Sequence, residues 1–411
     1  MSTNTVNQYA RDPRLIADAP GLKGVLDSYR RRLSQGELGS LPVMVGLVVI
    51  WLIFYLSNDR FLSPVNLTNL MLQISAMGTI SVGLVLVLLL GEIDLSAGAV
   101  SGLAAAVMAM LSVKHQLPGV PSLLVGLGAG AAVGLFHGLW FTRMRVPTFV
   151  VTLAGQLGWQ GALLYVLGDT GTVNLNDDLI VSLTGTFFSP AIAWTVTVLA
   201  IGILTAVMLN GRRRRAKAGL PLAPWRSTLM AVGAPSAVLI AAMTVFTMDR
   251  GLPLAVVIFV GLALMLELML RHTRFGRHTF AVGGNAEAAR RAGISVPGIR
   301  TTIFMLASAL AACGGILAAS RLMAVNQSSG SGDVLLNAIA AAVIGGTSLF
   351  GGRGSAWSAL LGALVIGSIS NGMDLLALSS SVKFMVTGGV LLVAASIDAL
   401  SRKGRQASGR A

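Results

Sequence analysis

The chain has 411 residues, of which 54% are hydrophobic and only 11% are charged, and its mean hydropathy is +0.78. Because soluble domains devote about a quarter of their residues to charge, this composition excludes an ordinary soluble protein. It predicts an all-α, polytopic transmembrane helical bundle. The single cysteine, Cys313, excludes an intramolecular disulfide and a cysteine-based metal site. The four histidines show no metal-ligand spacing, so we expect no metal site.

Apolar runs recur along the chain, and a crossing helix needs about 20 mostly apolar residues. We predict about 10–12 spans in a transmembrane domain at 41–400, after a polar, basic leader at 1–40 and before a basic tail at 401–411. The candidate spans are 41–56, 66–90, 96–113, 121–142, 148–167, 190–209, 228–247, 253–270, 301–320, 335–349, 355–373 and 382–398. No small-residue cleavage site follows the first run, so we interpret it as a retained span.

Basic residues mark the cytoplasmic side of a membrane protein, and here they fall on alternate sides of the spans. With the N-terminus inside, all but five of the 30 Lys and Arg residues lie in inner segments. The exceptions are Arg60, Lys114, Arg250, Arg321 and Lys383. We therefore predict a multi-pass protein of the cell inner or plasma membrane with both termini cytoplasmic. This topology accounts for the net charge of +14 without a nucleic-acid partner, and the basic run 212–217 suits contact with anionic membrane lipid.

Two carboxylates, Glu92 and Asp94, lie between apolar runs in the sequence GEIDLS at 91–96. Carboxylates next to a membrane interior are costly and are functional candidates by default. Asp94 and Ser96 are also well placed to cap a helix that begins near residue 96. Two interpretations stay open for these three residues: helix capping, or direct contact with a substrate or a gate.

Other polar side chains in or beside the spans are candidates for a hydrophilic pathway. They include Gln156, Asn337 and Asn371, although each could equally hydrogen-bond a neighbouring helix. For His137, which lies within a span, we expect a satisfied packing role. No catalytic Ser–His–Asp set can be assembled from the sequence.

Several glycine-rich stretches invite comparison with nucleotide-binding motifs. No P-loop sequence occurs, so the chain does not hold ATP in that way. Glycines at 126, 128, 130 and 134 resemble a dinucleotide fingerprint, but they lie in an apolar run and predict close helix packing. Residues 86–102 and 340–360 both pass through a glycine-centred break into a helix of small residues, a weak internal similarity of the kind found in transporters. Both breaks face the cytoplasm in the predicted topology.

The inner loop 271–300 contains a short helix with clear boundary signals. Gly283 and Gly284 are expected to break the preceding structure, Asn285 to cap the helix, and Glu287 to favour its positive start. The segment continues with Ala288, Arg290, Arg291, Gly293 and Ile294. A helix of about two turns is marginal alone in water, so we expect the membrane domain or a partner to hold it. An ordinary solvated connector is the alternative.

Four stretches give the chain a family resemblance. They are GEIDLSAG at 91–98, VPTFVVTLAG at 146–155, FGR at 275–277 with AVGGNAEAAR at 281–290, and AAAVIGGTSLFGG at 340–352. The chain thereby resembles the permease subunits of bacterial ATP-binding-cassette importers of ribose, xylose and galactose, in the branched-chain amino acid/ribose permease superfamily. Glu92, the sequence Asn371-Gly372-Met373 and the basic insertion 210–226 are closer to the xylose type.

The resemblance implies a homodimeric translocation pore with a cytoplasmic ATPase subunit below it and an extracytoplasmic sugar-binding protein above it. Residues 285–292 would be the coupling helix, seated on the ATPase. ATP and Mg²⁺ would bind to that partner, with no cofactor and no catalysis in this chain. The expected sugar is D-xylose, and ribose, galactose or another small sugar is the alternative within the family. A secondary sugar–proton symporter, with a carboxylate as proton carrier, is a more distant alternative.

Overall fold

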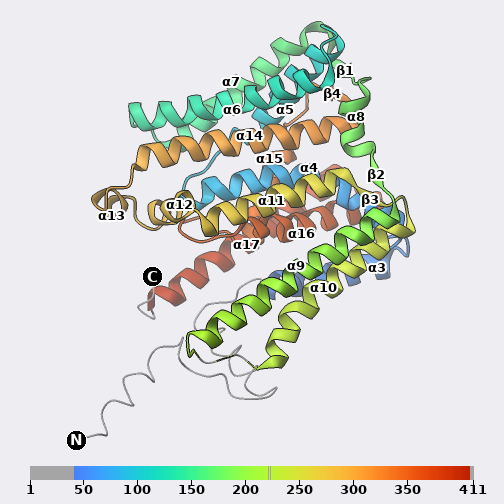
Figure 1. Cartoon of the computed structure of the whole chain (residues 1–411). Coiled ribbons are helices and arrows are strands. Elements are labelled where there is room, and N and C mark those ends of the chain that lie inside the picture. Colours follow the sequence, from blue (N-terminus) through green and yellow to red (C-terminus); the bar gives the residue numbers. More distant parts are fainter. Residues whose placement is uncertain (1–40, 221, 223, 408–411) are drawn as a thin grey trace, which may run out of the picture. The chain divides into compact units, whose positions relative to one another are not determined.

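A computed structural model describes residues 41–220, 222 and 224–407, and this part of the chain is almost entirely helical (Figure 1). It divides into two compact units. Of the described residues, the larger unit comprises 41–187 and 253–400, and the smaller comprises 188–220, 222, 224–252 and 401–407. The predicted leader at 1–40 and the last four residues of the predicted tail lie outside the described residues.

The larger unit contains long helices and short connecting elements. Its longer helices are α3 (Leu41–Ser57), α4 (Pro64–Leu89), α5 (Ala97–Val113), α6 (Gly119–Met144), α7 (Thr148–Leu167), α11 (Leu254–His272), α14 (Val296–Leu322) and α16 (Ala356–Leu375). Its shorter elements are η1 (Gly168–Thr170), β1 (Thr172–Asn174), α8 (Asp178–Gly185), α12 (Arg274–Gly284), α13 (Ala286–Arg291), β4 (Ala324–Asn326) and α15 (Asp333–Ile344). Helix α17 (Ser380–Ala407) begins in this unit, and β2 (Phe187–Phe188) and β3 (Leu252–Pro253) lie where the chain passes between units.

Each of the twelve predicted spans contains a helix, which confirms the prediction of a polytopic helical bundle. Among the described residues, eight helices are long and apolar enough to cross a membrane: α4, α6, α7, α9, α10, α11, α14 and α16. The other predicted spans correspond to shorter apolar helices, in α3, α5, α15 and the first half of α17.

Helix α15 departs most from its predicted span, 335–349. It ends at Ile344, and its 12 residues are about 18 Å long, whereas the hydrocarbon core of a bilayer is about 30 Å thick. Gly345 caps the helix, and Gly346 has a φ of +106°, which a side chain would strain. The helix is therefore shorter than its predicted span, because the chain turns at this glycine pair and becomes helical again only at Ala356.

Helix α14 lies at the centre of the larger unit, where it packs against α4, α5 and α6. Small residues allow the close approach. An added Cβ at Gly130 would lie 2.5 Å from the Cβ of Ala312, and one at Gly126 would lie 3.0 Å from the carbonyl oxygen of Ala104. The packing role predicted for this glycine run is confirmed at Gly126, Gly130 and Gly134, whereas Gly128 faces open space.

A two-stranded antiparallel ladder joins the segments that follow α7 and α14. Strands β1 and β4 place Val173 opposite Val325, and both side chains are buried. Beyond β1, the Asp177 carboxylate accepts hydrogen bonds from the amides of Leu179 and Ile180, which fixes the start of α8. In the predicted topology both helices end outside, so this ladder belongs to the external end of the unit.

The smaller unit is a hairpin of α9 (Pro190–Lys217) and α10 (Trp225–Met248). Helix α9 continues beyond its predicted span, 190–209, through the arginine run, because arginine is a good helix former. The Arg212 guanidinium lies 4.2 Å from the centre of the Trp225 ring and donates a hydrogen bond to the Thr228 hydroxyl at 3.1 Å. The basic insertion 210–226 is thus largely the end of one helix and the start of the next.

Candidate functional site

Helix α13 is the short helix predicted in the inner loop. The Asn285 side-chain oxygen accepts a hydrogen bond from the amide of Ala288 at 2.9 Å, as expected of an N-cap. The helix runs from Ala286 to Arg291, and Gly293 follows with a φ of +81°, a conformation that favours glycine. The cap, the helix and the stop residue are confirmed.

The exposed face of α13 carries three charged side chains that interact with each other. Glu287 forms ion pairs with Arg290 at 2.7 Å and with Arg291 at 3.1 Å, and the three side chains are 50%, 70% and 79% exposed. Hydrogen bonds from Arg290 and then Arg291 lower the pKa of the Glu287 carboxyl below its usual value. These three charged side chains are therefore exposed to solvent.

The opposite face of α13 holds the helix on the larger unit. Ala289 is 4% exposed and belongs to the same apolar cluster as Ile299 of α14, and Ile294 packs against that cluster. The amide of Ile294 also donates to the carbonyl oxygen of Ala289 at 3.0 Å. The membrane domain therefore stabilises a helix that would be marginal alone, and α13 is joined to the start of α14.

The two glycines before α13 end the structure that precedes it, as predicted. They are the last two residues of a further helix, α12, which the sequence did not reveal. This helix begins where the Thr273 hydroxyl accepts a hydrogen bond from the amide of Gly276 at 3.1 Å. We refer to α12 and α13 together as the coupling segment.

Gly283 lies where three parts of the chain meet: the end of α12, the break between α4 and α5, and the break between α15 and α16. The amide of Gly352 donates to the carbonyl oxygen of Leu89 at 2.9 Å. An added Cβ at Gly283 would overlap that oxygen, and one at Gly351 would lie 2.8 Å from the amide nitrogen of Gly91. We call these five residues the glycine junction. The two breaks lie on one side of the unit, as predicted, and both contact the coupling segment.

Glu92, in the first break, links three elements. The Thr148 hydroxyl of α7 donates to its Oε2 at 2.6 Å, and the Arg300 guanidinium of α14 lies 2.8 Å from its Oε1. The Glu92 and Arg300 side chains are only 18% and 31% exposed, so water screens this pair less than a surface ion pair. Glu92 and Arg145 also line a pocket of about 490 Å³. Of the pathway candidates, Glu92 is therefore in a position to contact a solute.

Asp94 is 1% exposed and folds back on the start of α5. Its Oδ1 accepts hydrogen bonds from the Ser96 amide at 2.8 Å and from the Ser96 hydroxyl at 2.6 Å. Asp94 therefore sets the turn that leads into α5, but it bonds Ser96, the residue before the helix, and no amide of the helix itself. The Ser96 side chain occupies the N-cap position and directs its hydroxyl to Asp94, so neither side chain caps α5.

His137 extends this buried chain of hydrogen bonds. The indole N–H of Trp159 donates to His137 Nε2 at 2.9 Å, and Nδ1 lies 3.4 Å from the Ser96 hydroxyl oxygen. Nε2 therefore carries no proton, so the hydrogen in this arrangement is on Nδ1. The structure brings together the Ser, His and Asp that the sequence could not assemble. Asp94, Ser96 and His137 are all at most 1% exposed, and their hydrogen bonds join the start of α5 to α6 and α7, as expected of a packed His137.

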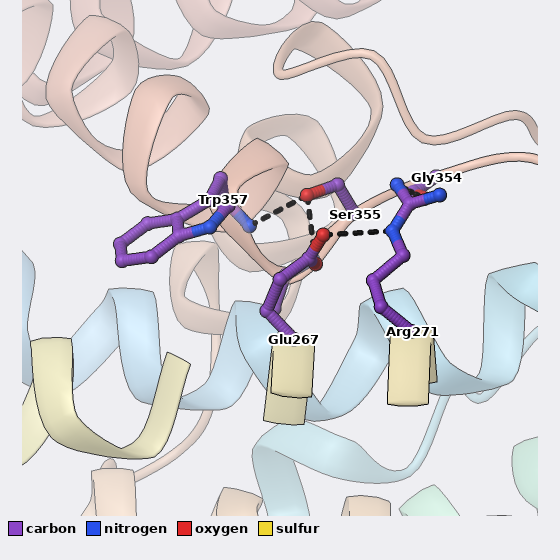
Figure 2. Close-up of polar contacts among 6 residues, drawn as sticks. Glu267, Arg271, Gly354, Ser355 and Trp357 are labelled. Carbon is purple, nitrogen blue, oxygen red and sulfur yellow. Dashed lines mark hydrogen bonds and ion pairs between the residues drawn. The ribbon is translucent and has the colours of Figure 1, made fainter. Parts of the chain in front are cut away.

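The sequence reasoning missed two residues, Glu267 and Arg271, at the end of α11. Figure 2 shows the Glu267 carboxylate between Arg271 and the start of α16. Oε2 accepts hydrogen bonds from the Ser355 hydroxyl and from the Ala356 amide, each at 2.8 Å, and Arg271 Nε donates to Oε1 at 2.9 Å. The signal was present, because Glu267 interrupts an apolar run as Glu92 and Asp94 do.

Comparison with known proteins decides the family. Residues 66–395 match the family model described as the permease component of the branched-chain amino acid transport system. The chain belongs to this permease family. The permease is 33% identical to the xylose transport system permease protein XylH of Haemophilus influenzae over 389 residues, which are 90% of this chain and 99% of XylH. No solved structure matches.

Further relatives carry two different sugar names. Identity to XylH of Escherichia coli K12 is 32% over 88% of the permease and 92% of that protein. Identity to the ribose import permease protein RbsC of Bacillus subtilis is 31% over 89% of the permease and 94% of RbsC. The predicted resemblance to permeases of the ribose and xylose class is confirmed, and so is the prediction of a multi-pass protein of the cell membrane.

The remaining pathway candidates of the permease lie on separate helices. Asn371 of α16 exchanges two side-chain hydrogen bonds with Asn66 of α4, at 2.8 and 3.0 Å. Asn337 of α15 donates to Asp333 at 3.3 Å, and Gln156 of α7 is half-buried. Among the described residues, no hydrogen bond joins any two of Gln156, Asn337 and Asn371, so the structure does not gather them into one site.

No metal site is found in the part of the permease that the structure describes. There, no group of three or more His, Cys, Asp and Glu side chains could hold an ion.

Proposed function

We propose that the permease is the membrane subunit of an ATP-driven, binding-protein-dependent importer of a monosaccharide, with D-xylose as the sugar. The observation that carries this proposal is the 33% identity to XylH over 99% of that protein's length. Ribose is the second candidate, because RbsC is 31% identical over a similar share of the chain. Two copies of the permease would form the pore, with a sugar-binding protein on the outside.

The partner on the inside would be an ATPase that binds ATP and Mg²⁺ and docks on α13. The exposed charges of Glu287, Arg290 and Arg291 support this, since they lie on the face of α13 opposite to the buried Ala289. The other residues proposed to form the docking loop are Gly283, Gly284, Asn285, Ala288, Gly293 and Ile294. The basic end of the bundle would lie against anionic lipid.

Alternating access would follow from the contacts of the coupling segment. Only four residues separate α13 from α14, and Gly283 at the end of α12 touches both helix breaks through the glycine junction. A displacement of α13 by the ATPase would therefore reach Arg300 on α14 and Leu89 at the end of α4. Arg300 would then move relative to Glu92, and the ion pair between them would act as an inner gate beside the pocket.

The choice of sugar is tested by transport competition. The permease would be reconstituted in liposomes with its ATPase and binding protein, and uptake of labelled xylose would be measured against an excess of unlabelled ribose, galactose or xylose. We expect unlabelled xylose to suppress uptake much more than the other two sugars. Stronger suppression by ribose would transfer the assignment to the ribose type while leaving the importer mechanism in place.

A further inference from the structure

The second helix break, between α15 and α16, is held by a carboxylate from a different helix. Glu267 lies in the last turns of α11 with a side chain only 14% exposed. Its Oε2 accepts hydrogen bonds from the Ser355 hydroxyl and from the amide of Ala356, the first residue of α16 (Figure 2). A negative charge at the positive start of a helix is favourable, so α11 and the beginning of α16 are tied together.

This contact does more than complete the cap of α16. The helix already has a local cap, because the Ser355 hydroxyl accepts a hydrogen bond from the amide of Trp357 at 3.2 Å, and Glu267 bonds the adjacent amide of Ala356. A carboxylate in an apolar helix is costly to bury. Besides bonding that one amide, Glu267 adds a mechanical connection between two helices.

Arg271 connects the same carboxylate to the coupling segment. Its Nε donates to Glu267 at 2.9 Å, and its terminal nitrogen Nη2 donates to the carbonyl oxygen of Gly354 at 3.4 Å. The guanidinium also lies 5.5 Å from the centre of the Phe280 ring, which is in α12. Arg271 therefore touches α12 on one side and the segment that leads into α16 on the other.

We propose that Glu267 and Arg271 are positioning residues that transmit displacement of the coupling segment to α16. The path runs from Phe280 of α12 through Arg271 to Glu267 and from there to the start of α16. It is separate from the glycine junction, which reaches the same break through backbone contacts. This inference rests on the proposed function, since it requires an ATPase that moves the coupling segment.

The test uses the complete complex of permease, ATPase and binding protein in liposomes. Sugar transported per ATP hydrolysed is measured for Glu267→Gln, Glu267→Ala, Arg271→Ala and Arg271→Lys. We expect the two alanine variants to lower this ratio by at least about fivefold, the low end of typical coupling between sites, while the amount of ATPase bound stays unchanged. Glu267→Gln keeps a side-chain oxygen for the Ala356 amide but loses its charge, and Arg271→Lys keeps the charge, so both should be intermediate.

A matched control is Asp374→Asn, which removes the carboxylate that pairs with Lys383 near the other end of α16. Its ratio should equal that of the wild type. The proposal is overturned if the alanine variants keep the wild-type ratio, or if uptake and ATP hydrolysis fall together in proportion to the folded permease. Failure of the proposed function is distinguishable, because it would show as absent ATP-dependent uptake in the wild-type complex itself.

Discussion

Replacing Gly283 by alanine should weaken the glycine junction, whereas the same change at the adjacent Gly284 should not. An added Cβ at Gly283 would overlap the carbonyl oxygen of Leu89 and lie 2.9 Å from the amide nitrogen of Gly352. Ordinary van der Waals contact begins at 3.4 Å. Even the contact with the Gly352 nitrogen, at 2.9 Å, therefore requires the two atoms to move apart by about 0.5 Å. Both partners are backbone atoms, which cannot rotate away. At Gly284 an added Cβ meets nothing within 4 Å.

The energies follow from two opposing effects. Alanine is favoured over glycine in a helix by up to about 1 kcal/mol, and overpacking in a close-packed site costs about 1–3 kcal/mol. The overlap with the Leu89 carbonyl oxygen is severe, so the upper end of the overpacking range applies, and Gly283→Ala should destabilise the permease by about 2 kcal/mol. Gly284→Ala should be neutral, or should stabilise it by less than about 1 kcal/mol, since only the helix propensity changes.

The assay compares the two variants by thermal unfolding of the purified permease and by ATP-dependent uptake in liposomes. Gly283→Ala should unfold at a lower temperature and lose most uptake, because the strain lies where the coupling segment meets both helix breaks. Gly284→Ala should match the wild type in both measurements. Equal behaviour of the two variants would refute the close contact between α12 and the break after α4.

Three further predictions concern polar contacts. Glu92→Gln should destabilise the permease by about 1.5–3 kcal/mol, the usual value for a hydrogen bond to a charged group, since Arg300 loses its ion pair. An unchanged unfolding temperature would count against the gate contact. Trp159→Phe removes the donor to His137 and should cost about 1 kcal/mol without changing sugar preference, whereas altered preference would indicate a site on the sugar pathway. The pKa of the Glu287 carboxyl is lowered on folding, so its contribution is present above the usual pKa of 4.5 and is lost only as the pH falls through the lower folded value. Hydrogen exchange of α13 corrected for intrinsic rates should thus be constant between about pH 6 and 8, and a change there would contradict this assignment.

The sequence predicted the elements whose signals are local. Each of the twelve runs identified by length and hydropathy contains a helix, and Asn285 and Gly293 marked both ends of α13. Helix boundaries differed where glycine and arginine have more than one structural role. Gly345 and Gly346 end α15 early, and the arginine run extends α9. Gly283 stays helical at the end of α12, where it lies against the backbone of Leu89.

Contacts between distant parts of the chain were not accessible from the sequence. Asp94 and His137 are 43 positions apart by their numbers, and Glu267 and Ala356 are 89 positions apart. Only the packing of α5 on α6 and of α11 on α16 brings them together. A carboxylate in an apolar run is a signal that something must compensate its charge, but neither the partner nor the connection that results can be read from one sequence.

The central claim is that ATP hydrolysis on a partner subunit drives sugar import through this permease. The most direct test is xylose uptake into liposomes that contain the permease, its ATPase and its binding protein, with ATP inside and no ion gradient. Accumulation that requires both ATP and the binding protein is the predicted result. Accumulation driven by a proton gradient alone, without ATP, would contradict the account and would establish a symporter with a carboxylate such as Glu92 as the proton carrier.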